Sequence, residues 1–279
     1  MKQGFVKVAS ATPRIRVADP VYNAQVICEQ AKEAAEHGAK IVVFPELCIT
    51  GYTCNDLFLQ ELLLEKAKEA LLTIAEETGQ LETLFLVGLP VDKDGRLYNV
   101  AAVLYRGRIL GMIPKKNIPM YAEFYEGRHF TPGEETVTEY RLGKQVIPFG
   151  SNLLFRCEEL PELVLGCELC EDLWVAEPPS TSHALMGATV IANLSASNET
   201  VSKDDYRTLL IKASSARLLC GYIYTSAGEG ESTQDLVFGG HDLIAENGTL
   251  LVQSARFTTG ILYTDLDLSL IHISEPTRH

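Results

Sequence analysis

Short apolar runs alternate along the chain with longer segments in which apolar residues recur at helical spacing. The runs have the length and composition of buried strands, and they predict strands over residues 5–9, 41–44, 84–88, 163–167, 189–194 and 222–226. The helical periodicity predicts three amphipathic helices, over residues 22–37, 57–77 and 205–220. Gly38 is placed to end the first of these helices.

Turn dipeptides add antiparallel hairpins to this pattern. They are Asp94-Gly95, Arg106-Gly107 and Asn247-Gly248. The strands near them are predicted over residues 98–105, 109–113, 236–245, 249–254 and 260–265. The segment 132–149, which is rich in Pro and Gly, is interpreted as a surface insertion. Strands mixed with long helices and hairpins indicate a layered α/β fold.

The length and composition of the chain exclude several classes of protein. With 279 residues, 46% of them hydrophobic, the chain is long enough for one large domain with a substantial core. A net charge of -13 argues against nucleic acid or an anionic membrane as the main partner. Seven cysteines, an odd number at irregular spacing, do not suit a secreted disulfide framework. No signal peptide or membrane span is evident, so the predicted location is cytoplasmic.

Two charged residues stand just beyond predicted strands. Glu46 follows the strand at 41–44, where partial burial would raise its pKa and suit a general base. Lys115 follows the strand at 109–113 and lies between two prolines, so a fixed ammonium there could stabilise an oxyanion. Each residue, taken alone, could also be an ordinary solvated charge.

Cys170 stands just beyond the strand at 163–167, where a thiol at a tight turn could act as a nucleophile. A small buried hydrophobe is the alternative. Cys167 and Cys170 also form a Cys-x-x-Cys pair. A structural zinc site would need a second ligand pair, which the sequence lacks, and a thioredoxin-like motif belongs to a much smaller domain. We therefore expect Cys167 to belong to the strand.

The strings around these three residues resemble the nitrilase superfamily, whose members use a Glu-Lys-Cys triad in this order. The resemblance covers about residues 5–265 and implies a four-layer α-β-β-α sandwich. It narrows to the glutaminase domain of glutamine-dependent NAD synthetases. The strings that carry this narrower resemblance lie at residues 50–58, 119–126, 170–174 with 178–180, and 228–233 leading to 237–241.

The resemblance implies roles for single residues. By position, Glu46 is the general base, Lys115 the oxyanion stabiliser and Cys170 the nucleophile. The glutamine-binding residues of the family fall on Tyr121, Ser197 and Lys203. A cation such as Lys203 also suits the carboxylate of an amino acid substrate. From the residues alone, Lys203 could be a solvated charge, Ser197 a loop hydroxyl, and Tyr121 part of a packed lid.

Other acidic residues also lie near the motifs. Glu126 resembles a second glutamate of the superfamily that orients the lysine. Glu171 and Asp172 are either supports for the site or residues that only flank the turn. His129 and two other histidines have no nucleophile to pair with in sequence and are interpreted as structural.

We expect residues 1–267 to form the nitrilase-like glutaminase domain. Residues 268–279 continue no strand or helix pattern and resemble translated adapter sequence, so they are interpreted as a non-native tail. The resemblance implies a partner domain that adenylates deamido-NAD, but the sequence has no Ser-Gly-Gly-rich ATP loop. ATP and Mg would belong to that missing synthetase domain, and no cofactor or metal is expected in this one.

The expected partners are L-glutamine, the ammonia-accepting synthetase domain and further copies of the chain in a homo-oligomer. Three other functions remain open at this point. They are a stand-alone amidase acting on another small carboxamide, a binding module without catalysis, and a thiol-redox protein.

Overall fold

The structure is a computed structural model that describes residues 4–269. Apart from Leu268 and Ser269, the tail expected at residues 268–279 lies outside the described residues. Within the described part of the chain, no helix is both long enough and apolar enough to cross a membrane.

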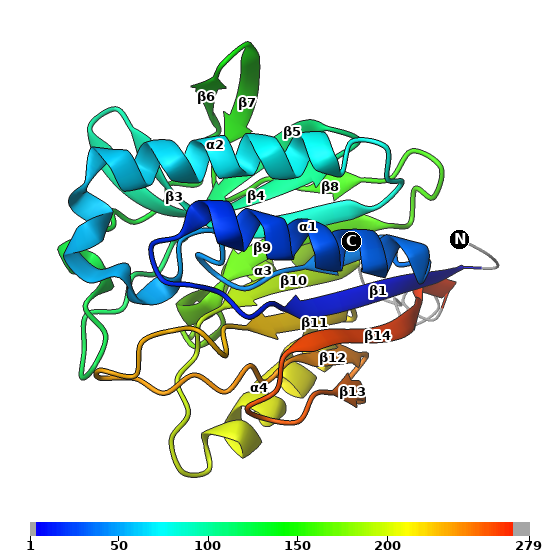
Figure 1. Ribbon diagram of the computed structural model, residues 1–279. Helices are drawn as coiled ribbons and strands as arrows, with labels where there is room; N and C mark the ends of the chain where they lie inside the picture. The colour runs from blue at the N-terminus through cyan, green and yellow to red at the C-terminus, as the bar shows by residue number, and fades with distance from the viewer. Residues whose placement is uncertain (1–3, 270–279) are drawn as a thin grey trace.

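Two β-sheets form the centre of the molecule (Figure 1). The first has eight strands in the order β14 (Gly260–Asp267), β1 (Phe5–Thr12), β2 (Ile41–Val43), β3 (Leu84–Lys93), β4 (Arg96–Tyr105), β5 (Arg108–Pro114), β7 (Gln145–Phe149) and β6 (Thr138–Leu142). The second has six strands in the order β13 (Thr249–Gln253), β12 (Leu243–Glu246), β11 (Gly221–Ser226), β10 (Val190–Ser195), β9 (Val164–Leu169) and β8 (Phe155–Arg156). Parallel pairs at β1–β2–β3 and β9–β10–β11 lie beside antiparallel hairpins in each sheet.

Helices cover the outer faces of both sheets. The helices are α1 (Pro20–Glu36), α2 (Glu61–Glu77), α3 (Pro179–Leu185) and α4 (Lys203–Leu218), with 3₁₀ helices η1 (Tyr52–Leu59), η2 (Glu126–Arg128) and η3 (Cys170–Leu173). Figure 1 shows α1 and α2 side by side over the eight-stranded sheet and α4 against the six-stranded sheet.

Three apolar clusters fill the spaces between these layers. Side chains of α1 and α2, such as Ile27 and Leu71, pack on the outer face of the first sheet. Side chains of α3 and α4, such as Ile211, pack on the outer face of the second sheet. The strand β2 shows the alternation expected of a strand buried on both faces, because Val42 belongs to the outer cluster while Val43 lies between the sheets. The α-β-β-α sandwich expected from the resemblance is therefore confirmed.

Most predicted elements are present with shifted ends. Helix α1 begins at Pro20, earlier than expected, because Asp19 caps it by accepting the Tyr22 N–H at 3.1 Å. The prediction of one helix over 57–77 was wrong at its start. The chain forms η1 first, and α2 begins only at Glu61, after the extended residue Gln60.

Two segments differ from expectation. Residues 132–149, interpreted as a surface insertion, contain the β6–β7 hairpin, which projects from the first sheet at the top of Figure 1. Tyr140, Ile147 and Phe149 of this hairpin are buried, so it also extends the core. The strand expected over 236–245 is limited to β12, because Gly240 adopts a left-handed φ of 57° and interrupts the extended chain.

Candidate active site

The ends of three strands meet between the two sheets. Glu46 lies three residues beyond β2, and Lys115 directly follows β5 in the same sheet. Cys170 directly follows β9 in the other sheet. It adopts a left-handed φ of 39°, an uncommon conformation for a non-glycine residue, at the sharp turn from β9 into η3. All three residues are buried.

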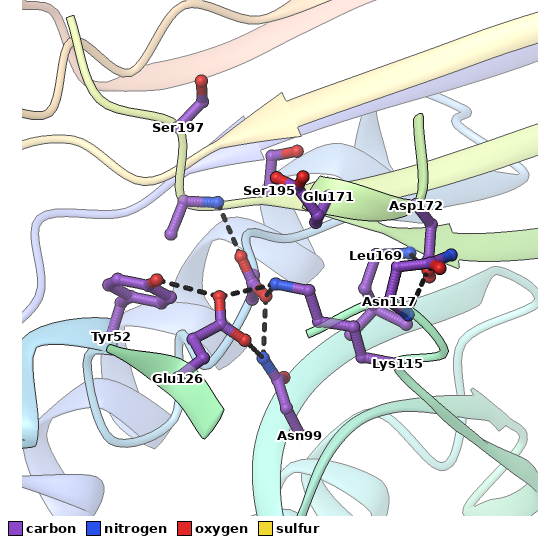
Figure 2. Close-up of polar contacts among 12 residues, drawn as sticks. Tyr52, Asn99, Lys115, Asn117, Glu126, Leu169, Glu171, Asp172, Ser195 and Ser197 are labelled. Atoms are coloured by element: carbon purple, nitrogen blue, oxygen red, sulfur yellow. Dashed lines mark hydrogen bonds and ion pairs between the residues drawn. The ribbon is translucent and has the colours of Figure 1, made fainter. Parts of the chain in front are cut away.

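Lys115 lies between two carboxylates. Its Nζ donates to Oε1 of Glu46 at 2.7 Å and to Oε1 of Glu126 at 2.6 Å. Figure 2 shows the ammonium of Lys115 directed at Glu126, with Tyr52 on the other side of that carboxylate. The Tyr52 hydroxyl donates to the same Glu126 oxygen at 2.8 Å. The structure therefore brings Glu46 and Lys115 together and adds Glu126 to the pair.

Glu46 is held at both carboxylate oxygens. Its Oε1 also accepts from the Asn99 side chain at 2.7 Å, and its Oε2 accepts from the Ala196 main-chain N–H at 2.9 Å. Burial raises the pKa of Glu46 to about 7, and the nearby Glu126 charge adds to this, while Lys115 opposes it. A carboxyl that titrates near neutral pH is suited to take up and return a proton.

The ammonium of Lys115 is stable in spite of its burial. Burial by itself favours the neutral amine, but the carboxylates of Glu126 and Glu46 outweigh burial and hold the pKa of Lys115 well above its usual value. Removing one carboxylate would leave the buried ammonium with a single anionic partner. Lys115 thus supplies a fixed positive charge at neutral pH.

The thiol of Cys170 lies in the electrostatic field of the same three groups. Burial, together with the charges of Glu46 and Glu126, raises the pKa of Cys170 to about 12. Lys115 and the Ala196 N–H act in the opposite direction. The thiol is therefore protonated at neutral pH, and it needs a base to become a nucleophile. Cys167, by contrast, packs in the apolar layer between the sheets, as expected for a strand residue.

Sequence reasoning missed three members of this cluster. Asn99 donates to Glu46 and, at 3.4 Å, to Oε2 of Glu126. The other two are Tyr52 and the Ala196 N–H. A detectable signal existed for Asn99, since it is a polar residue inside the apolar strand Tyr98 to Tyr105, where a buried amide needs partners.

The residues expected to bind substrate each contact polar or aromatic partners of their own. The Tyr121 hydroxyl donates to both oxygens of Glu171 at 3.0 Å, although the Tyr121 side chain is 55% exposed. Burial of its hydroxyl and the Glu171 charge raise the pKa of Tyr121, and Cys170 also contributes. Tyr121 and Glu171 therefore form one polar unit beside the nucleophile candidate.

Lys203 begins α4 and lies against two aromatic rings. Its Nζ is 5.1 Å from the centre of the Trp174 ring and 5.6 Å from that of Phe124. It also donates to the side-chain oxygen of Asn198. Burial lowers the pKa of Lys203 from its usual value.

Ser197 is buried, and its hydroxyl already has a partner. Its Oγ accepts from Nη2 of Arg207 at 3.3 Å, and its main-chain N–H donates to Ser226 at 3.2 Å. Arg207, which the sequence did not suggest, is fully buried and forms an ion pair with Glu199 at 2.8 Å. Ser197 thus depends on a buried guanidinium for its orientation.

A pocket opens beside this cluster, on the side of Tyr52 and Glu126. Aromatic, acidic and uncharged polar side chains form most of its wall, among them Phe58, Phe130, Glu123 and Asp235. Cys170 does not line this pocket. We therefore locate the chemistry at the buried cluster of Glu46, Lys115 and Glu126, which lies next to the pocket.

Comparison with known proteins shows the family of this chain. The family model described as carbon-nitrogen hydrolase matches residues 7–272. The chain belongs to the carbon-nitrogen hydrolase family. It is a hydrolase domain of the nitrilase superfamily with an α-β-β-α sandwich, and its candidate catalytic groups lie where the two sheets meet.

The curated relatives are longer than this chain. A glutamine-dependent NAD(+) synthetase of Mycobacterium bovis is 43% identical over 272 residues, which are 97% of this chain and 40% of that protein. A protein of the same name from Thermotoga maritima is 32% identical over 96% of this chain and 43% of its own length. The chain thus spans about two fifths of the length of these relatives and matches their hydrolase part.

Solved structures show the same fold. A glutamine-dependent NAD(+) synthetase from Cytophaga hutchinsonii superimposes with a TM-score of 0.85 at 28% identity, over 94% of this chain and 43% of that chain. An amidase from Nesterenkonia sp. superimposes with a TM-score of 0.74 at 21% identity, over 98% of this chain and 94% of that chain. The second likeness concerns the fold alone.

Proposed function

We propose that this domain hydrolyses the side-chain amide of L-glutamine through a thioester on Cys170, giving glutamate and ammonia. The observation that carries the proposal is the buried cluster in which Lys115 contacts Glu46 and Glu126 within the field of the Cys170 thiol. This cluster supplies a base, a fixed cation and a nucleophile in one place.

In the first step the thiol attacks the amide carbonyl carbon. Glu46, whose pKa is about 7, accepts the thiol proton as the carbon–sulfur bond forms. Because burial raises the pKa of Cys170 and keeps the thiol protonated, the attack needs Glu46 as the proton acceptor. The carbonyl electron pair moves onto oxygen and leaves a tetrahedral oxyanion.

Lys115 stabilises this oxyanion, aided by a main-chain N–H at the start of η3. Removal of one such donor typically costs about 3 kcal/mol of transition-state stabilisation. Protonated Glu46 then returns its proton to the amide nitrogen, the carbon–nitrogen bond breaks, and ammonia leaves. Glu46 next takes a proton from water, whose oxygen attacks the thioester, and the thiol is regenerated as glutamate forms.

Charges around the thiol favour an amino acid as substrate. Lys203 provides a cation for the α-carboxylate, and the Glu171 carboxylate provides an anion for the α-ammonium group. Tyr121 holds Glu171, and Ser197 adds a polar wall oriented by Arg207. Opposite charges at two places suit a zwitterion better than a simple amide such as butyramide.

The ammonia acceptor in this proposal is the NAD synthetase domain of the longer relatives, which would use it to amidate deamido-NAD. ATP and Mg would belong to that domain, and we expect the chemistry at Cys170 to need no cofactor. We also expect a homo-oligomer, and a cytoplasmic location from the odd number and irregular spacing of the cysteines.

The direct test measures ammonia and glutamate released from glutamine by the parent chain and by Cys170→Ala. We expect release to fall to background in this variant. Cys157→Ala, at a partly exposed cysteine, is the matched control and should retain activity. Undiminished release by Cys170→Ala would overturn the assignment. Faster release from simple amides than from glutamine would instead favour a stand-alone amidase.

A further inference from the structure

A single carboxylate in the loop between β11 and β12 holds the first residues of η1. Glu231 accepts three hydrogen bonds from two neighbouring residues. They are the Tyr52 N–H at 2.7 Å, the Thr53 N–H at 3.0 Å and the Thr53 hydroxyl at 2.6 Å. No ion pair to Glu231 occurs among residues 4–269, so these donors alone compensate its charge.

The residue that Glu231 holds is also the one that reaches the active site. The Tyr52 ring packs edge-on against Phe238 at 5.8 Å. Its hydroxyl donates to Oε1 of Glu126 at 2.8 Å, and this is the oxygen that also accepts from Lys115 at 2.6 Å. A shift of the Tyr52 backbone would therefore move one of the two donors on that oxygen, and with it the carboxylate that orients Lys115.

Other contacts already keep the loop in place. The Ile15 N–H donates to the Glu229 carbonyl at 3.1 Å, and Gly230 packs against the same backbone so closely that a Cβ there would lie 1.9 Å from the Ile15 carbonyl oxygen. The loop therefore has anchors besides the hydrogen bonds that Tyr52 and Thr53 donate to Glu231. A partly buried carboxylate without a cation loses part of its hydration, which points to a role at the residues that it binds.

We propose that Glu231 is a positioning residue, which acts through Tyr52 and Glu126 to hold the Lys115 ammonium in its catalytic orientation. The inference rests on the proposed function, because Lys115 is the oxyanion stabiliser there. It assigns a role in the geometry of the active site to a loop that is far from the triad in sequence. A change that displaces the Glu231 carboxylate would reach the active site through Tyr52.

A double-mutant cycle tests the inference. Glu231→Gln keeps the shape of the side chain but places an amide N–H₂ against donors. We expect it to lower kcat for glutamine by about tenfold and to change KM by less than about twofold. Tyr52→Phe should have a similar effect. If Glu231 acts through the Tyr52 hydroxyl, adding Glu231→Gln to Tyr52→Phe should lower kcat by less than about twofold more.

A second readout separates this inference from the proposed function. The rate of Cys170 alkylation by iodoacetamide, followed by mass spectrometry of the Cys170 peptide, reports the charge cluster without turnover of glutamine. The same non-additive pattern should appear in this rate. Absence of ammonia release by the parent chain would overturn the function alone, whereas independent, multiplicative effects of the two substitutions on alkylation would overturn the role of Glu231.

Two further variants serve as a control and as a replacement for Glu231→Gln. Glu229→Gln changes an exposed glutamate of the same loop, paired with Arg14 at 3.0 Å, and should leave both rates unchanged. If Glu231→Gln does not fold, Thr53→Val removes the hydroxyl donor from Glu231 and enters the cycle in its place. Parent-like rates in Thr53→Val would then contradict the inference.

Discussion

Asp172 and Asn117 join the two segments that carry the ammonium and the thiol. Oδ1 of Asp172 accepts both the main-chain N–H and the side-chain amide of Asn117 at 2.8 Å (Figure 2). Oδ2 accepts from the Leu169 N–H at 3.0 Å. Asn117 lies two residues after Lys115, and Leu169 directly precedes Cys170. One buried carboxylate therefore sets the distance between cation and nucleophile across the two sheets.

Asp172→Asn should impair catalysis more than folding. An amide cannot accept all three of these bonds, so the lysine loop and the cysteine turn lose their common anchor. We expect kcat for glutamine to fall by about a hundredfold, as for an active group displaced by roughly 1 Å. The measurement is steady-state ammonia release together with thermal unfolding. Glu177→Gln, at an exposed residue nearby, is the control and should behave like the parent.

The pH dependence of kcat/KM should show an acidic limb near pH 7. Glu46, with a pKa of about 7, must be ionised to accept the thiol proton, so activity rises as pH increases through this value. Glu126→Gln removes a charge that raises the Glu46 pKa. The limb should therefore move to lower pH while kcat decreases, because Lys115 also loses a partner. A limb that stays in place would show that it does not report Glu46.

Asn99→Asp should move the limb in the opposite direction. Asn99 donates to Glu46 at 2.7 Å, and an aspartate of the same shape would place a third carboxylate against Glu46 and Glu126. Like charges raise the pKa of a carboxyl, so the acidic limb should shift above pH 7. We expect activity at pH 7 to fall by about a hundredfold or more. Opposite shifts in Glu126→Gln and Asn99→Asp, measured in one buffer series, would support a single titrating cluster.

Much of the fold could be predicted because the burial of each layer requires a local pattern of apolar residues in the sequence. Apolar runs such as 41–44 mark strands buried on both faces, and the polar residue after each run marks where the strand leaves the core. Glu46, Lys115 and Cys170 could be found in this way, and the family resemblance supplied their order. Lys203 is the first residue of α4. Because contact with solvent is enough to explain a charge at a helix end, the local pattern alone does not mark Lys203 as a site residue.

The partners of these residues could not be found in the same way. Tyr52 and Asn99 contact Glu126 only because η1 and β4 meet η2 in space, and nothing in the local pattern states this pairing. The 236–245 segment shows a related difficulty. Its composition is that of a strand, but the chain instead turns at Gly240, and Phe238 forms an isolated bridge to Asn198. Tertiary contacts outweighed local propensity there.

Gly88 allows the backbone that carries Glu46 to lie close to β3. A Cβ on Gly88 would lie 2.2 Å from the Leu47 nitrogen and 2.7 Å from the Pro45 carbonyl oxygen. Only glycine lets the backbone around Glu46 lie against β3. Gly88→Ala must therefore displace the backbone that carries the base, since no flexible side chain is available to move.

We expect Gly88→Ala to lower kcat by about a hundredfold, because a displacement of roughly 1 Å at a catalytic group has an effect of that size. The matched control is Gly221→Ala, whose Cβ would meet the end of the Leu266 side chain at 2.6 Å. That side chain can adopt another rotamer, so the control should lose some thermal stability and keep its activity. Ammonia release and melting temperature, measured on both variants, check the prediction. Equal losses of activity in the two variants would mean that Gly88 matters only for packing between the layers and not for the placement of Glu46.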